Sequence, residues 1–117
     1  MNREEALTKI KESLATEIAQ VIAPPGSSYE EHVRMLTQNL LACVIEPIEV
    51  KVTSTCAPEG EFELYKNSKV WGIAHNKGSW LLTLDDANEF ALGWGDDPMS
   101  IMMHGFSSSD ALGEWCT

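Results

Sequence analysis

The first part of the chain carries hydrophobic residues at helical spacing. Between Arg3 and Ala23 they recur at steps of three and four, at Leu7, Ile10, Leu14, Ile18, Val21 and Ile22. Such steps place side chains on one stripe of an α-helix, and the charged residues of the segment fall mostly outside that stripe. The pattern therefore predicts an amphipathic helix over residues 3–23.

A second helical stripe follows the short segment APPGSS, whose prolines and glycine stop the first helix. The stripe consists of Tyr29, Val33, Leu36, Leu40, Cys43 and Val44. Ser27 or Ser28 is placed to cap this helix, with a glutamate three residues later, and Pro47 marks its end. Two amphipathic helices joined by so short a link predict a helical hairpin.

From Ile48 onward the apolar period becomes alternating, which is typical of β-strands. We expect strands at residues 48–55, 62–65, 70–75, 80–84, 90–94 and 99–104. The links between the later strands, such as NKGS and GDDP, are short and turn-forming, and they permit only antiparallel neighbours. SSSDALGEWC predicts a short capped helix at about residues 108–116.

These elements predict an α+β fold in a single domain, residues 1–117. In this fold the helical hairpin packs on one face of an antiparallel meander sheet of about five strands, and the short helix follows at the C-terminal side.

The turns suggest a register that sorts the strand residues into two faces. It pairs His75 with Trp80, Leu84 with Phe90, and Trp94 with Met99. The bulky face then holds Trp71, Ile73, His75, Trp80, Leu82, Leu84, Phe90, Leu92, Trp94, Met99, Ile101 and Met103. The other face is nearly flat and includes Gly72, Ala74, Ala91, Gly93, Met102 and His104. We expect the helical hairpin to cover the bulky face.

A flat, small-residue face needs an explanation, because glycine weakens a strand. Three explanations are open. The one we rank first is that the C-terminal helix folds back over this face. Alternatively, the face is an interface for a partner protein or a second copy, or it forms the wall of a ligand pocket. The candidate interface is Gly72, Ala74, Ala91, Gly93, Met102 and His104.

A second candidate site lies at one end of the predicted sheet. It comprises His75, Trp80, Trp94, Asp96 and Asp97. A histidine beside carboxylates and tryptophans suits a small pocket or a cation site, although a structural histidine at a strand end is commoner. The three cysteines and three histidines are scattered, so no metal site or cofactor is predicted, and no catalytic motif is recognised.

The net charge of −10 narrows the class of partner. It disfavours direct binding to nucleic acid or to an anionic membrane, whereas it suits a basic protein partner or simple solubility. Mimicry of nucleic acid fits less well, because lysines at Lys51, Lys66, Lys69 and Lys77 interleave with the acids.

Function follows from these observations only as a hypothesis. We expect a small acidic cytoplasmic accessory protein without catalytic activity, which acts through protein contacts as an inhibitor, immunity or chaperone-like module, with a homodimer as one form. The alternative is a small-molecule-binding protein or enzyme with a pocket between sheet and helices, lined by tryptophan and histidine.

Overall fold

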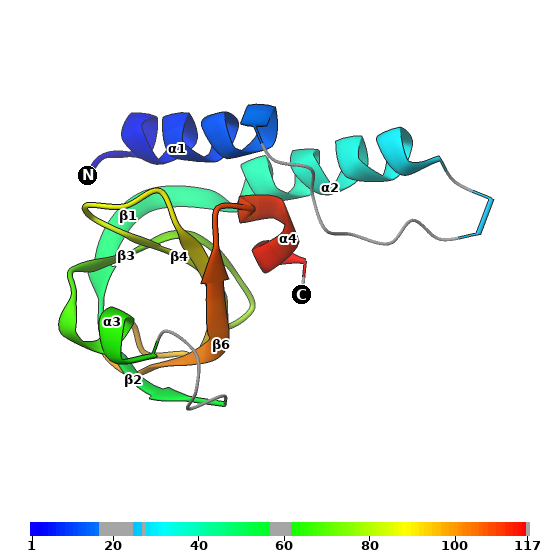
Figure 1. Cartoon of the computed structure of the whole chain (residues 1–117). Coiled ribbons are helices and arrows are strands. Elements are labelled where there is room, and N and C mark those ends of the chain that lie inside the picture. Colours follow the sequence, from blue (N-terminus) through cyan, green and yellow to red (C-terminus); the bar gives the residue numbers. More distant parts are fainter. Residues whose placement is uncertain (17–24, 27, 57–61, 117) are drawn as a thin grey trace.

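The computed structural model describes residues 1–16, 25–26, 28–56 and 62–116 (Figure 1). The helices are α1 (Arg3–Thr16), α2 (Tyr29–Cys43), α3 (Phe62–Asn67) and α4 (Ala111–Trp115). The strands are β1 (Val44–Val50), β2 (Val52–Thr55), β3 (Val70–Asn76), β4 (Ser79–Leu84), β5 (Phe90–Trp94) and β6 (Ile101–Ser108). This arrangement confirms the α+β class.

Polar side chains begin the first two helices. The Glu5 N–H donates to Asn2 Oδ1 at 2.8 Å, and the Asn2 N–H donates to Glu5 Oε1 at 3.3 Å, so the two residues form a reciprocal capping box. The Ser28 hydroxyl accepts from the Glu31 N–H at 3.2 Å, which confirms Ser28 as one of the two predicted caps of α2. The predicted residues 17–23 of the first helix, and most of the hairpin link, fall outside the described residues.

The second helix ends earlier than Pro47. Val44 adopts extended backbone angles (φ −65°, ψ 130°) and begins β1. Val44 is β-branched, and it pairs with Ala74 of β3. The apolar stripe at Cys43 and Val44 therefore spans a junction between helix and strand, which spacing alone does not reveal.

The strands form one six-stranded sheet in the order β1-β3-β4-β5-β6-β2. The predicted meander is present as the antiparallel run from β3 to β6, and β1 pairs antiparallel with β3. However, β2 pairs parallel with β6, so the sheet is mixed rather than purely antiparallel.

The sheet closes on itself because β1 and β2 are one continuous strand bent at Lys51. The Lys51 N–H donates to the Pro98 carbonyl, and the Ile101 N–H donates to the Lys51 carbonyl, each at 2.9 Å. The two edges of the sheet are thereby joined, and Figure 1 shows the strands arranged in a ring, which we call the cylinder. The segment predicted as one strand therefore forms both edges of the sheet, as β1 and β2. Closure in this way gives the backbone groups at the edges hydrogen-bond partners.

The predicted register is right at one turn and wrong at two. His75 lies opposite Trp80, as expected. Phe90, however, pairs with Thr83 instead of Leu84, and Trp94 pairs with Met102 instead of Met99. An irregularity in β3 between Gly72 and Ala74 also changes the phase within that strand. The two predicted faces are consequently mixed.

Two hydrophobic cores result. The outer core lies between the helices and the cylinder and consists of Ala6, Ile10, Leu40, Val44, Ile73, Ala74, Leu81, Phe90, Ala111 and Leu112. The inner core fills the cylinder with Val50, Val52, Tyr65, Val70, Trp80, Leu82, Leu84, Ala91, Ile101 and Met103. The predicted bulky face is thus divided between two cores. Each buried large side chain contributes about 1.5–3 kcal/mol to folding.

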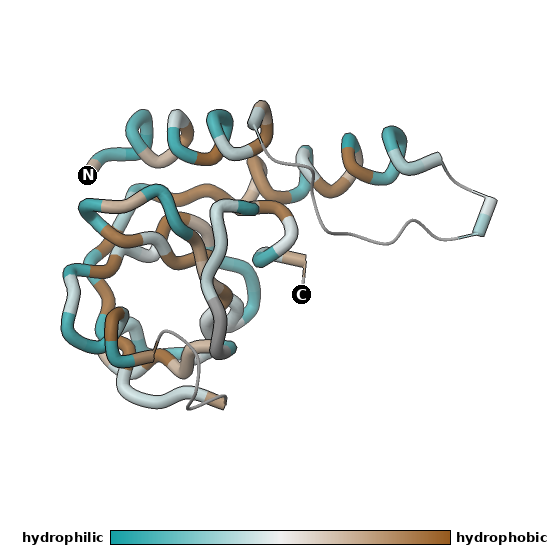
Figure 2. The backbone as a smooth tube through the Cα atoms, viewed as in Figure 1, coloured by the Kyte–Doolittle hydropathy of each residue, from teal (hydrophilic) through white to brown (hydrophobic). Residues whose placement is uncertain are grey.

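Helices α1, α2 and α4 cover the outer core. Helix α1 packs against β1 and α4, α2 against β3 and α4, and α4 against β5. Figure 2 shows the apolar turns of α1 directed toward the cylinder and its polar turns directed away. In Figure 1 the N-terminal half of α2 extends beyond the cylinder, and Tyr29 and Met35 are exposed there. None of the described helices has the length and apolar character needed to span a membrane.

The strand predicted at residues 62–65 is instead α3. Phe62 and Tyr65 lie one helical turn apart, and Tyr65 enters the inner core while Leu64 is exposed. A segment of only four residues fits an alternating and a helical pattern equally well, so the pattern could not separate the two.

Candidate functional site

The outer surface of β5 and β6 carries three half-buried side chains, Trp94, Met102 and His104, which we call the β5–β6 patch. Met102 is the register partner of Trp94. The rings of Trp94 and His104 meet edge to face, with centroids 5.0 Å apart and planes at 88°. The structure thus brings together one residue predicted for a pocket and two predicted for a flat interface.

His75 and Trp80 lie on the other side of the sheet. Their rings stack with centroids 4.1 Å apart and an interplanar angle of 27°. The Trp80 indole N–H donates to the Gly95 carbonyl at 2.8 Å, and the Gly78 N–H donates to His75 Nε2 at 3.4 Å. Because Trp80 faces the inner core and Trp94 faces outward, the predicted row of His75, Trp80 and Trp94 does not form one pocket.

Two exposed carboxylates adjoin the β5–β6 patch in the turn between its strands. Asp97 shapes this turn, because its Oδ1 accepts from the Met99 N–H and its carbonyl accepts from the Ser100 N–H, each at 2.9 Å. The turn contacts the β3–β4 turn through the Gly95 N–H, which donates to the Gly78 carbonyl at 2.9 Å. Asp96 and Asp97 therefore place negative charge in the turn that joins the two strands of the patch.

The predicted flat face is not an exposed surface. A Cβ atom on Gly72 would lie 2.8 Å from Trp80 Cε3, and one on Gly93 would lie 2.6 Å from Ile101 Cγ2. Ala91 belongs to the inner core and Ala74 to the outer core. These four positions are buried beneath neighbouring side chains, so they do not form the exposed surface that the predicted interface requires. The C-terminal helix does cover the sheet, but over the outer core.

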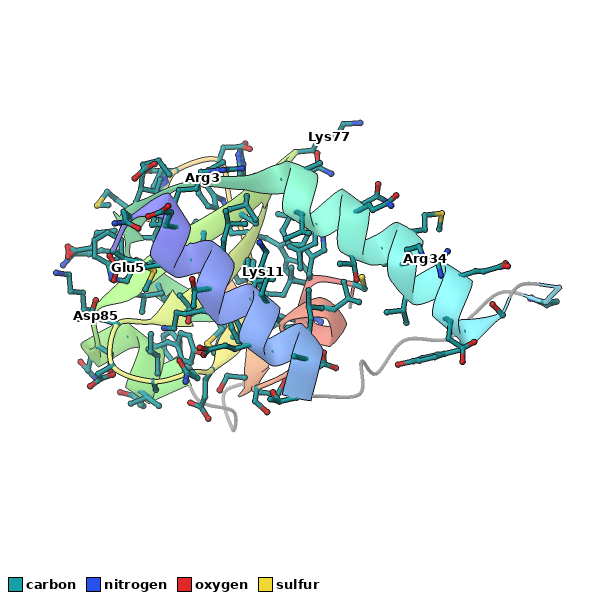
Figure 3. All side chains as sticks on the ribbon, turned by 90° about the horizontal axis from the view of Figure 1, so that it is seen from above. Arg3, Glu5, Lys11, Arg34, Lys77 and Asp85 are labelled. Carbon is teal, nitrogen blue, oxygen red and sulfur yellow. The ribbon has the colours of Figure 1, made fainter. Side chains whose placement is uncertain are left out.

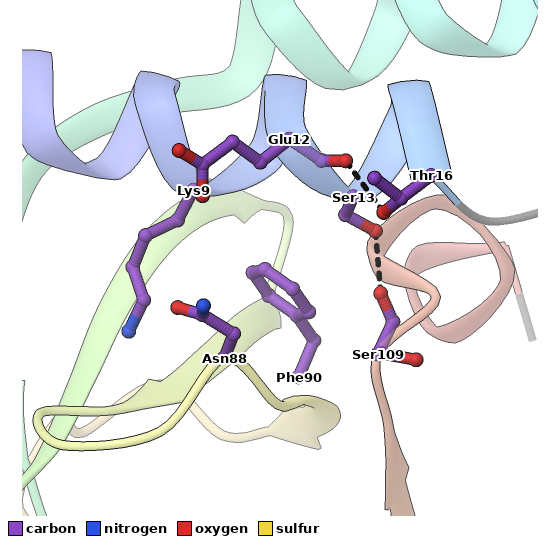
Figure 4. Close-up of a pocket in the computed structure, with 7 residues that line it drawn as sticks. All are labelled: Lys9, Glu12, Ser13, Thr16, Asn88, Phe90 and Ser109. Carbon is purple, nitrogen blue, oxygen red and sulfur yellow. Dashed lines mark hydrogen bonds between the residues drawn. The ribbon is translucent and has the colours of Figure 1, made fainter.

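A pocket of about 230 Å³ lies between α1 and the sheet (Figure 4). It is lined by Lys9, Glu12, Ser13, Thr16, Asn88, Phe90 and Ser109. Neither tryptophan nor histidine lines it, so it lacks the lining that the sequence-based alternative of a ligand pocket requires. Its position between helix and sheet agrees with that alternative.

The polar groups of this pocket hold the structure together. The Lys9 ammonium donates to Thr83 Oγ1 at 3.1 Å and to the carbonyls of Leu84 and Ala87 at 2.7 and 3.0 Å. Burial lowers the pKa of Lys9, and the nearby carboxylates Asp85 and Asp86 oppose that shift. An ammonium with three acceptors is a structural tether rather than a nucleophile.

Ser13 joins α1 to the start of α4. Its hydroxyl donates to the Ser109 carbonyl and accepts from the buried Ala111 N–H at 2.9 Å. Asp110 then caps α4 by accepting from the Gly113 N–H at 2.9 Å, which agrees with the predicted capped helix. Lys9 and Ser13 were not identified from the sequence, because a polar residue within an amphipathic helix gives no sign of a distant partner.

Within the described part of the chain, no group of three or more histidine, cysteine, aspartate or glutamate residues is arranged to hold a metal ion.

Comparisons with protein-family models, with curated proteins and with solved structures find no match to this chain. The candidate site is therefore defined by its own geometry: an aromatic and sulfur-containing patch beside an acidic turn.

Proposed function

We propose that the protein is a small cytoplasmic accessory protein that acts without catalysis, by binding a basic partner protein through the β5–β6 patch. The observation that carries this proposal is the packing of Trp94 against His104 and Met102 at the surface, next to Asp96 and Asp97. Tryptophan and methionine are enriched at the centres of protein interfaces, where a few aromatic side chains supply most of the binding energy.

The surrounding charge supports a basic partner rather than a second copy. The chain has 18 acidic and 8 basic residues, and the exposed Asp96 and Asp97 lie in the turn that joins β5 to β6. Opposite charges at a rim accelerate association, whereas two acidic copies repel one another. The burial of Gly72 and Gly93 beneath neighbouring side chains disfavours a homodimer through the flat face.

Trp94→Ala tests the proposal. We expect a partner captured from the lysate of the native host by the wild-type protein to be retained at least about tenfold less by the variant, since a central aromatic contributes about 2 kcal/mol or more to binding. Quantitative mass spectrometry of the two captures measures this ratio, and circular dichroism verifies the fold.

Tyr29→Ala is the matched control, because Tyr29 is an exposed aromatic on α2, away from the patch. It should leave capture unchanged. Asp96→Asn with Asp97→Asn should slow association mainly at low salt. Equal capture by wild type and Trp94→Ala would contradict the assigned surface, and sedimentation of the purified protein as a dimer that Trp94→Ala dissociates would assign the patch to self-association.

A further inference from the structure

Three of the eight basic residues line a single pocket on a different part of the molecule. The pocket has a volume of about 290 Å³. Lys51 comes from the bend between β1 and β2, Lys66 from α3, and Lys69 from the link between α3 and β3. In a chain with a net charge of −10, such a local excess of positive charge is unexpected on composition alone.

Two of the pocket lysines hold their ammonium groups against aromatic rings. Lys66 Nζ lies 5.6 Å from the centroid of the Phe62 ring, and Lys69 Nζ lies 5.0 Å from the centroid of the Trp71 ring. Aromatic faces attract a cation but carry no net charge, so they position the ammonium without neutralising it. Among the described residues that line the pocket, Glu49 alone is acidic.

The rest of the site is suited to an oxyanion. The Ser68 hydroxyl, a hydrogen-bond donor, also lines the pocket, and Val50, Val52 and Val70 form an apolar part of its wall. Trp71, whose ring holds Lys69, is itself fixed because its indole N–H donates to Asp85 Oδ1 at 2.8 Å. Lysine is a common phosphate ligand, acting as a point charge with three donors.

We propose that this pocket binds the phosphate group of a small phosphorylated molecule. Its volume of about 290 Å³ is just below the usual range for drug-sized ligands, which suits a small ligand. A long polyanion such as nucleic acid would also meet the acidic remainder of the surface. A small dianion is affected mainly by charges within about 8 Å at physiological salt, and three of the four charged residues that line the pocket are lysines.

Titration of the isotope-labelled protein with pyrophosphate, followed by amide chemical shifts at constant ionic strength, tests this site. We expect saturable shifts confined to residues 49–52 and 65–71, with a dissociation constant in the millimolar range or below. Lys51→Gln, Lys66→Gln and Lys69→Gln together should weaken binding at least about tenfold, because each exposed ion pair contributes up to about fivefold.

Lys11→Gln, Arg34→Gln and Lys77→Gln together provide the control. These three exposed residues lie outside the pocket, and their replacement changes the net charge by the same amount (Figure 3). The control should retain wild-type affinity. Absence of saturable shifts in the wild-type protein, or equal losses in the two triple variants, would overturn the proposal. Binding by wild type that the pocket variant loses would support it whether or not the β5–β6 patch binds a partner.

Discussion

Gly93→Ala is expected to lower the free energy of unfolding by about 1–3 kcal/mol, although alanine is normally better tolerated than glycine in a strand. The added Cβ would lie 2.6 Å from Ile101 Cγ2 and 2.9 Å from Leu82 Cδ1, inside the cylinder. Both neighbours are fully buried, so neither can move without disturbing the inner core. Urea denaturation followed by tryptophan fluorescence measures the change.

The sign of this effect separates the cylinder from the flat sheet surface predicted from sequence. On an exposed face, Gly93→Ala would stabilise the protein by about 0.5–1 kcal/mol. Ser54→Ala, at an exposed position in β2, serves as the control and should stay within about 0.5 kcal/mol of wild type. Combining Gly93→Ala with Ile101→Ala should cost less than the sum of the two single changes, since the second makes room for the first. A stabilising Gly93→Ala would contradict the inward position of this residue.

Lys9→Met is expected to lower the free energy of unfolding by about 2–3 kcal/mol. Methionine keeps the length and apolar stem of lysine but removes the three hydrogen bonds that the ammonium gives to Thr83, Leu84 and Ala87. Hydrogen bonds to charged groups contribute about 1.5–3 kcal/mol each, and the total is smaller than their sum because Lys9 is half-buried. Chemical denaturation measures the loss.

Lys11→Met is the matched control, because Lys11 lies on the same helix and is exposed. It should change stability by less than about 0.5 kcal/mol. Hydrogen exchange provides a second measurement: Lys9→Met should accelerate exchange in residues 84–90, where the tether ends, more than in β1. Equal destabilisation by the two methionine variants would show that the loss reflects helix charge rather than the tether.

Helices α1, α2 and α4 and the positions of most strands could be predicted from the sequence, because their patterns are local. Ser28 caps α2 as expected, and the meander from β3 to β6 follows from its short turns. The register could not be predicted as reliably. The stretch between β4 and β5 allows Phe90 to pair with either Thr83 or Leu84, and a one-residue change reverses the faces. The parallel pairing of β2 with β6 joins residues that are distant in the sequence. Alternation of apolar and polar residues predicts a strand, but it does not indicate which strand is its neighbour.

The candidate site was predictable in its members but not in its grouping. Trp94 and His104 were both identified, yet they were assigned to opposite faces because Trp94 was paired with Met99 instead of Met102. The lysine pocket was not predicted at all. Lys51 and Lys69 are far apart along the chain, and they come together because β1 pairs with β3, which places Val50 opposite Val70.

The bent strand formed by β1 and β2 has a consequence for the order of folding during synthesis. On the ribosome, residues 44–50 can pair with β3 early, whereas residues 52–55 have no partner until residues 101–103 have been made. Closing that long loop costs conformational entropy before its contacts can form. Until it occurs, the nascent chain displays an unpaired strand edge and an open apolar interior, which are the features that molecular chaperones recognise.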